Sequence, residues 1–356
     1  MNQEKVDMSR TPNNLYRNSS WRNKISNVAQ VAGIETSILD NGQGRNTRIA
    51  WMNTGSGLRL KLVPDRALDI TEAFINAYSL AWISHRGTVP PLRSATHGGE
   101  WLRAFGGGLM TTCGLDHVGG PEADGDARRG LHGEISNIPA EIISVVQPNL
   151  DDPEPKMSIS GKILQSTVFG PHLELTRTIS ARLGESEFEV HDIVRNVGNQ
   201  PTPHMLLYHL NFGWPLVDRD TRIIWDGDWE SRDSDMDRKI FNPDNDFKTC
   251  PDVLEFHQGT GEAAVFIDPA AKTDGTYQFG LVNPGLGLEV LVTAQKEQLP
   301  ALTNWQHFGL REYVVGLEPG TNHPIGQLTA KEQDKLILAQ PGETYEYNLK
   351  FSVNLK

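Results

Sequence analysis

Most of this sequence alternates between short apolar runs and clusters of Gly, Pro, Asn and Asp. Leu58, Leu60 and Leu62 occupy every second position of one run, which places the three side chains on one face of a strand. A Gly-containing segment, residues 53–57, separates this run from residues 47–52 and is typical of a turn between paired strands. Few stretches have the helical periodicity that crossovers in a parallel sheet require. The pattern therefore predicts a mainly β fold of antiparallel sheets.

Further strands are predicted where apolar residues alternate or cluster, at residues 157–164, 173–181, 188–194 and 205–212. The last of these runs is too apolar for an open surface, so we expect it in the centre of a sheet. Residues 226–248 are rich in Asp, Asn and Arg and have little periodicity, which indicates a long loop at the rim. Short helices are expected only at residues 28–31 and 99–105.

The 356 residues, 38% of them hydrophobic, are enough for a substantial core. Because all-β folds often form one unit of this size, we expect an N-terminal arm over residues 1–30 and a single β-sandwich domain over residues 31–356. No apolar run approaches the roughly 18 residues of a membrane span, and the N-terminus lacks the apolar centre of a signal peptide. We therefore expect a cytoplasmic protein without a membrane partner, with the oligomeric state left open.

The charge and the cysteines narrow the class of ligand. A formal net charge of -12 opposes binding to nucleic acid, whose phosphates require clustered Lys and Arg, and a neutral small molecule is the more natural partner. Cys113 and Cys250 are too few for a disulfide framework or a structural zinc site, so both are expected to be reduced thiols. The glycines of residues 106–108 lack the strand-to-helix context of a phosphate loop.

Three polar residues are candidates for chemistry. His132 follows a loop rich in Gly and Asp and precedes a glycine, which allows a ligand to approach the backbone; the alternative is a histidine that shapes a turn. His209 shares one strand face with Asn211, which favours a polar pocket over a histidine satisfied within the core. Glu318 closes an apolar run before a proline, where it is either a cleft residue or a carboxylate in solvent.

The order of these residues resembles that of the aldose 1-epimerase-like, or galactose mutarotase-like, superfamily. Members carry a histidine in a Leu-His-Gly segment, a second histidine in a strand, and a glutamate in a Leu-Glu-Pro segment near the C-terminus, which here correspond to His132, His209 and Glu318. Residues 64–70 and 111–119 are similar to an uncharacterised branch of the DUF4432 type, and the likeness extends from about residue 31 to the end. It implies a galactose mutarotase-like β-supersandwich of antiparallel sheets.

The resemblance also implies an isomerase that binds a small carbohydrate and interconverts its anomers at C1. Ring opening needs one base for the C1 hydroxyl and one acid for the ring oxygen, each contributing about 10²–10⁴ in rate, and it needs no cofactor and no metal. By resemblance Glu318 is the base and His209 the acid. The residues then assigned to substrate binding are His132, Arg66, Asp69, Asp116, His117, Asn211 and Trp305, with Tyr208 and Trp214 as further aromatic candidates.

Several alternatives stay open at this stage. Arg66 with Asp69 is either a substrate clamp or a structural ion pair, and Asp116 with His117 either orients hydroxyls or shapes a turn. The arginine and the aspartate that true galactose mutarotases use have no clear counterpart, so the sugar and its charge are not identified. A metal-dependent sugar isomerase with ligands His132, His209 and Glu318, and a non-catalytic sugar-binding protein, are the rival functions.

Overall fold

A computed structural model describes residues 19–92, 94, 96–125 and 127–356. Its five-stranded sheet contains, in order, β1 (Gly33–Ile38), β2 (Arg48–Asn53), β3 (Leu58–Val63), β4 (Asp69–Ile75) and β5 (Tyr78–Ser79). Its eight-stranded sheet contains β14 (Arg222–Ile224), β17 (Thr276–Asn283), β18 (Leu288–Gln295), β22 (Thr344–Leu355), β12 (Glu187–Asn196), β11 (His172–Arg182), β10 (Lys156–Ser166) and β9 (Glu141–Val146).

The seven-stranded sheet carries His209, Trp305 and Glu318. Its order is β15 (Gly227–Ser231), β16 (Ala263–Pro269), β19 (Ala301–Gly309), β20 (Glu312–Gly320), β13 (Thr202–Gly213) and β21 (Ile337–Ala339), and β6 (Thr111–Leu115) also pairs with β13. A separate hairpin joins β7 (Glu122–Asp124) to β8 (Ala127–Arg129). The strand pairs in these sheets are antiparallel, as the sequence predicts.

Helices are short and lie in the connections. Over the described ranges, the α-helices are α1 (Asp235–Ile240) and α2 (Gln327–Glu332). The 3-10 helices are η2 (Ser19–Lys24), η3 (Val28–Gln30), η4 (Gly42–Gly44), η5 (Glu100–Arg103), η6 (Ile135–Asn137) and η7 (Glu255–His257). Within the described part of the chain, no helix is long and apolar enough to cross a membrane.

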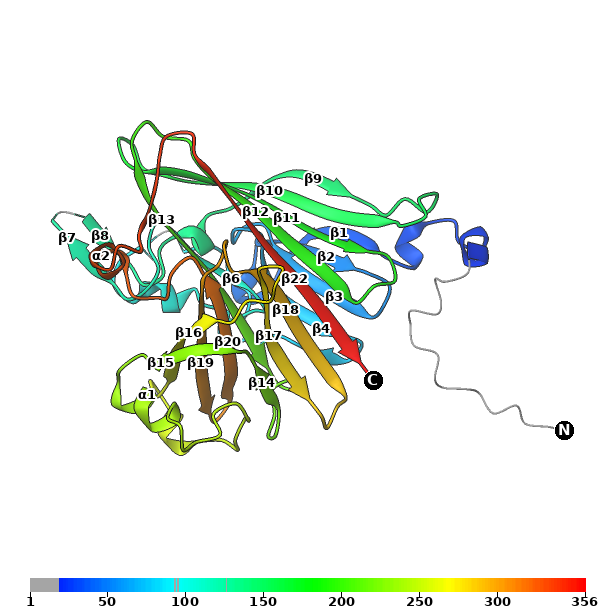
Figure 1. Cartoon of the computed structure of the whole chain (residues 1–356). Helices are drawn as coiled ribbons and strands as arrows, with labels where there is room; N and C mark the ends of the chain where they lie inside the picture. The colour runs from blue at the N-terminus through cyan, green and yellow to red at the C-terminus, as the bar shows by residue number, and fades with distance from the viewer. Residues whose placement is uncertain (1–18, 93, 95, 126) are drawn as a thin grey trace.

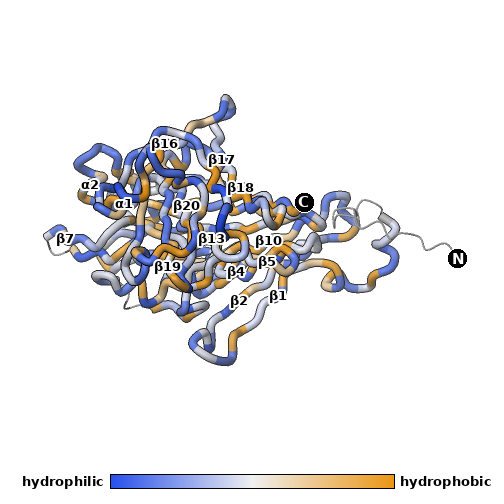
Figure 2. Tube along the Cα trace, turned by 90° about the horizontal axis from the view of Figure 1, so that it is seen from below, coloured by the Kyte–Doolittle hydropathy of each residue, from blue (hydrophilic) through white to orange (hydrophobic). Residues whose placement is uncertain are grey.

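The core lies between the sheets. One cluster of buried apolar side chains includes Leu60 of the five-stranded sheet, Leu175 of the eight-stranded sheet and Val315 of the seven-stranded sheet. Figure 1 shows the long strands β10, β11, β12 and β22 crossing the molecule beside β1 to β4, with β15, β16, β19 and β20 grouped at the opposite end. Figure 2 shows hydrophobic and hydrophilic residues interspersed along the chain trace, and strands such as β11 turn every second side chain toward the core.

A buried charge network ties the three sheets together. Arg177 on β11 is fully buried; its Nη1 donates to Asp69 Oδ1 on β4 at 2.8 Å, and its Nη2 donates to Asp192 Oδ2 on β12 at 2.6 Å. The hydroxyl of Tyr208 on β13 donates to the same Asp192 oxygen at 2.8 Å. Because an unpaired buried charge is costly, this arginine fixes the positions of β4 and β13 relative to the eight-stranded sheet.

The structure confirms most of the predicted elements and corrects one. The strands predicted at 157–164, 173–181 and 205–212 correspond to β10, β11 and β13, and β13 is buried along almost its whole length. The prediction of a loop over residues 226–248 is wrong in part, because β15 and α1 lie in it. Ser234 and Asp237 form a capping box at the start of α1, a sequence signal for a helix.

The predictions for the N-terminal region are tested only in part. Residues 1–18 of the predicted arm lie outside the described residues. The short helices predicted at 28–31 and 99–105 are present as η3 and η5. The division into an arm and a single domain stays a prediction.

Candidate active site

A cavity of about 520 Å³ opens on one face of the seven-stranded sheet. It is named the catalytic cavity because His209 and Glu318, the two candidate catalytic residues, line it. Its walls combine aromatic rings with a few charged groups, and its lining residues are Trp82, Trp101, Leu102, Phe105, Gly119, Gly120, Leu131, His132, His209, Arg232, Gly259, Thr260, Glu262, Ala264, Thr303, Trp305, His307, Glu312, Glu318 and Pro324. The cavity therefore brings together His132, His209 and Glu318 with Trp305 among the predicted residues.

His209 reaches the cavity because of its position on β13. Side chains alternate along the strand, so Tyr208 faces the core and bonds to Asp192, whereas His209 faces the cavity. The Nε2 atom of His209 lies 3.3 Å from Oε1 of Glu318. The His209 Nδ1 atom is buried and has no hydrogen-bond partner among the residues that the structure describes. His209 thus has one nitrogen directed at a carboxyl group.

Glu318 lies on β20, directly beside β13 in the sheet. Only 3% of Glu318 is exposed, which excludes the alternative of a carboxylate in solvent. The strand continues through Pro319 to Gly320, so the proline does not end it at once. Gly316 leaves room for the carboxyl group, because a Cβ atom at this position would lie 3.0 Å from Glu318 Oε1 and 2.9 Å from a ring carbon of Trp305.

His132 comes from the loop after the β7–β8 hairpin. Its backbone has φ 57°, and its amide donates to the carbonyl of Gly119 at 2.9 Å. Gly133 follows with φ 73° and lies so close to the carbonyl of Gly114 that a side chain does not fit there. The rings of His132 and His209 are perpendicular, with centroids 5.9 Å apart. This unusual backbone conformation places the second imidazole beside the first.

Aromatic rings surround the two imidazoles. Trp101 stacks on Phe105 with centroids 4.4 Å apart, and its ring edge meets His132 at 4.9 Å. On the other side, Trp305 meets His209 edge to face at 5.5 Å. Such walls exclude water and offer flat apolar surface, which suits the C–H face of a sugar ring.

The buried environment shifts the pKa of all three polar groups toward their neutral forms. Burial, with a smaller contribution from Glu262, raises the pKa of Glu318 to about 8. Burial lowers the pKa of His209 to about 4, and burial together with the other histidines lowers the pKa of His132 to about 3. Between about pH 4 and pH 8, His132 is therefore neutral, and His209 and Glu318 together hold one proton.

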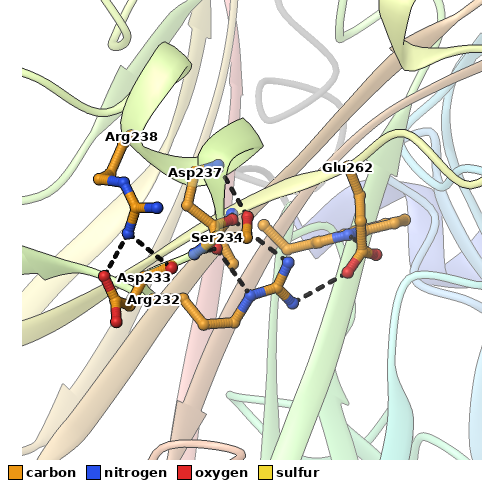
Figure 3. Close-up of polar contacts among 8 residues, drawn as sticks. Arg232, Asp233, Ser234, Asp237, Arg238 and Glu262 are labelled. Carbon is orange, nitrogen blue, oxygen red and sulfur yellow. Dashed lines mark hydrogen bonds and ion pairs between the residues drawn. The ribbon is translucent and has the colours of Figure 1, made fainter.

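Arg232 and Glu262 were not predicted from the sequence, yet both line the cavity. Figure 3 shows Arg232 held between two carboxylates: its Nη1 donates to Glu262 at 2.9 Å, and its Nε donates to Asp237 at 3.2 Å. The second oxygen of Glu262 accepts a hydrogen bond from Nε1 of Trp305 at 2.6 Å. This network fixes the Trp305 ring. It also places the Arg232 guanidinium at the cavity wall with two carboxylates, Asp237 and Glu262, as partners.

Five of the residues predicted to bind substrate do not line the catalytic cavity. Asp69 is 2% exposed and pairs with Arg177, not with Arg66, so the predicted Arg66–Asp69 clamp or ion pair is not formed. Arg66 donates instead to the side chain of Asn137 at 2.9 Å. Both side chains are buried and have polar partners within the fold.

Asp116, His117 and Asn211 have structural partners as well. The Asp116 carboxylate accepts a hydrogen bond from Gln165 at 2.6 Å, and His117 is 1% exposed, with its Nδ1 3.1 Å from Glu122. Asn211 donates to the carbonyl of His209 at 2.9 Å, which holds the strand beside the catalytic cavity. Of the further aromatic candidates, Tyr208 faces the core and Trp214 is 68% exposed away from the lining.

The rival function needs His132, His209 and Glu318 to be arranged as metal ligands. Among residues 19–92, 94, 96–125 and 127–356, no group of three or more His, Cys, Asp or Glu side chains is arranged to hold a metal ion. His132, His209 and Glu318 line the same cavity, where His209 Nε2 lies 3.3 Å from Glu318 Oε1 and the His132 ring meets the His209 ring edge to face.

Comparison with solved structures shows which fold the chain shares with known proteins. A putative aldose 1-epimerase from Klebsiella pneumoniae superimposes with a TM-score of 0.83 at 22% identity, over 94% of this chain and 86% of that chain. A galactose mutarotase-like protein from Clostridium acetobutylicum gives 0.64 at 11% identity, over 92% and 100% of the two chains. Galactose 1-epimerase from Lactobacillus acidophilus gives 0.55 at 11% identity, over 91% and 99%. The fold is thus the galactose mutarotase-like β-sandwich.

The sequence itself places the chain in a family. The family model described as "Domain of unknown function (DUF4432)" matches residues 44–353, and the protein belongs to this family. None of the proteins with a curated description matches the chain. The solved structures share less than 25% identity with this chain, and the likeness shows its fold.

Proposed function

We propose that this protein is an aldose 1-epimerase-type isomerase that interconverts the anomers of a sugar in the catalytic cavity. The observation that carries the proposal is the contact between His209 and Glu318, 3.3 Å apart, in a cavity walled by aromatic rings. The pair holds one proton near neutral pH, which supplies one acid and one base for the same substrate. The cytoplasmic location expected from the sequence stays a prediction.

The reaction moves two protons and changes no oxidation state. Glu318 takes the proton of the C1 hydroxyl, His209 gives a proton to the ring oxygen, and the bond between C1 and the ring oxygen breaks. Rotation about the C1–C2 bond then presents the other face of the carbonyl, and ring closure returns both protons. His132, which is neutral, forms a hydrogen bond with a substrate oxygen near C1.

For Glu318 to act as the base and His209 as the acid, the proton that the pair shares has to move to His209 when the sugar binds. The pKa directions place that proton on Glu318 before a sugar binds. A C1 hydroxyl that donates to Glu318 favours the carboxylate, and a ring oxygen that accepts from His209 favours the imidazolium. Because the two atoms lie 3.3 Å apart, the proton can pass directly from Oε1 to Nε2 as the sugar binds.

Saturation-exchange NMR across a panel of free aldoses tests the proposal. We expect the protein to accelerate exchange between the α and β anomers of at least one sugar above the rate in buffer. Binding without faster exchange would favour a non-catalytic sugar-binding protein. The absence of both binding and faster exchange for the whole panel would contradict a sugar site in this cavity.

The pH dependence of the reaction provides a second test. We expect kcat/KM to be highest between about pH 4 and pH 8 and to fall tenfold per pH unit outside these limits. Above about pH 8 the pair loses its only proton, and below about pH 4 it binds a second one. Rates of anomer exchange measured from about pH 3 to about pH 10, with the spontaneous rate subtracted, check this profile. A rate independent of pH over that range would contradict it.

Glu262 is expected to act on sugar binding through Trp305. Replacing Glu262 with Ala removes the partner of the indole N–H and leaves Arg232 with one carboxylate fewer. We expect KM to rise about tenfold, because a mobile ring stacks less well, with a smaller change in kcat. Steady-state rates for both constants provide the measurement, with Glu255→Ala at an exposed position as the matched control. A tenfold fall in kcat with KM unchanged would argue against this positioning role.

A further inference from the structure

A second cavity, of about 680 Å³, lies on the same face of the seven-stranded sheet. On β16, Ala264 lines the catalytic cavity and Phe266 lines the second cavity. On β19, Thr303 lines the catalytic cavity and Ala301 lines the second cavity. Residues two apart on a strand point to the same face and are about 7 Å apart. The two cavities are therefore neighbours along two adjacent strands.

The wall between the cavities is thin and lies beside the catalytic carboxyl group. Pro324 lines the catalytic cavity, while His323 and Ile325 on either side of it line the second cavity. The hydroxyl of Thr303 lies 3.5 Å from Nδ1 of His323. Thr303 is also the cross-strand partner of Glu318. The Thr303–His323 pair therefore lies between Glu318 and the second cavity.

The second cavity has a flat aromatic surface. The rings of Phe266 and His323 are stacked, with centroids 4.6 Å apart and planes 15° apart. Burial is the main cause that lowers the pKa of His323 to about 4, so the imidazole is neutral near neutral pH. A neutral stacked pair offers the kind of surface on which the C–H face of a sugar packs.

The charges around the second cavity select among sugars. Four carboxylates line it, those of Asp228, Glu230, Asp268 and Glu297, against one ammonium group, that of Lys335. Asp268 is further paired with Lys296 at 2.7 Å. Carboxylates accept hydrogen bonds from hydroxyl groups and repel phosphate and carboxylate substituents. The rim therefore suits a neutral sugar unit better than a phosphorylated or acidic one.

We propose that the substrate is a neutral reducing oligosaccharide of at least two units, with its reducing unit in the catalytic cavity and the next unit against Phe266 and His323. This inference rests on the function proposed above and adds the class of substrate. The two volumes, about 520 and 680 Å³, each fall within the range of small-molecule pockets, about 300–1,000 Å³. A single hexose leaves the second cavity unused.

The test compares reducing disaccharides of several linkages with the monosaccharides at their reducing ends. We expect kcat/KM for at least one disaccharide to exceed that of its monosaccharide about tenfold or more. Phe266→Ala should lower this disaccharide-to-monosaccharide ratio about tenfold, through KM, because the stacking surface is lost. Phe169→Ala, at a fully exposed turn outside both cavities, is the matched control and should leave the ratio unchanged.

A second variant and a binding measurement keep the outcome decisive. Glu230 is exposed on the rim, so Glu230→Lys tests the same ratio without a change in the core, and a several-fold fall is expected. If monosaccharides exchange faster and no disaccharide is preferred, the substrate class is wrong and the isomerase function stands. If no sugar exchanges faster, but a disaccharide binds at least tenfold more tightly than its monosaccharide and Phe266→Ala removes that difference, the catalytic proposal fails and the two-unit ligand stands.

Discussion

Glu318→Gln is expected to lower kcat/KM for anomer exchange at pH 7 by about 10²–10⁴-fold, with sugar binding retained. The amide keeps the shape and one hydrogen-bonding oxygen, but it can neither take the C1 proton nor share a proton with His209 at 3.3 Å. Exchange rates by NMR and sugar titration provide the two measurements. Glu332→Gln, at an exposed position on α2, is the matched control and should keep full activity. Full activity in Glu318→Gln would remove the proposed base.

Glu318→Gln, which is expected to lower activity, is expected to raise the stability of the folded state relative to wild type as the pH increases. The folded pKa of Glu318, about 8, is above the ordinary glutamate value of 4.5, so the folded state holds this proton more tightly than the unfolded chain. The stability that this gives is complete below about pH 4.5 and is lost as the pH rises through about 8. The amide in Glu318→Gln does not ionise, so the melting temperature of the variant should rise relative to wild type as the pH increases from about 4.5 to about 8, and the difference should then stay constant. An inactive variant that melts earlier than wild type at the alkaline end of this range would indicate misfolding.

The strands were predictable because burial leaves a local signal in the sequence. β3 and β11 each bury one face, so their apolar residues recur every second position. His209 was placed on the cavity face of β13 by the same alternation, opposite Tyr208. His132 became a candidate because it follows a loop rich in Gly and Asp and precedes a glycine. In each case the relevant information lies within a few residues of the position.

The residues that sequence reasoning missed depend on distant partners. Glu262 lines the catalytic cavity because β16 pairs with β19, which brings it to Trp305, 43 positions away. Asp69 lies three residues from Arg66, and this proximity suggested an ion pair between them. The Asp69 carboxylate instead accepts a hydrogen bond from Arg177, which is 108 residues away in the sequence. Only the capping box of Ser234 and Asp237, in the segment predicted as a loop, was a local signal that went unused.

Arg177→Met is expected to lower the free energy of unfolding by about 3–5 kcal/mol. The fully buried guanidinium also donates to the carbonyl of Ala67 at 3.0 Å, so its loss leaves two buried carboxylates, those of Asp69 and Asp192, without their cation. Urea denaturation followed by circular dichroism provides the measurement. Arg219→Met, which breaks an exposed pair with Asp252, is the matched control and should cost about 0.2–1 kcal/mol.

A loss of this size is a large part of the stability of a typical domain, so the single variant needs a companion. Replacing Asp69 and Asp192 with Asn in the Arg177→Met background removes the uncompensated charges and should restore part of the lost stability. If Arg177→Met costs less than about 1 kcal/mol, or if the companion is less stable still, the buried charges do not tie the sheets together. If the expected order holds, the same arginine that secures Asp69 on β4 and Tyr208 beside Asp192 also secures β13, the strand that presents His209 to Glu318.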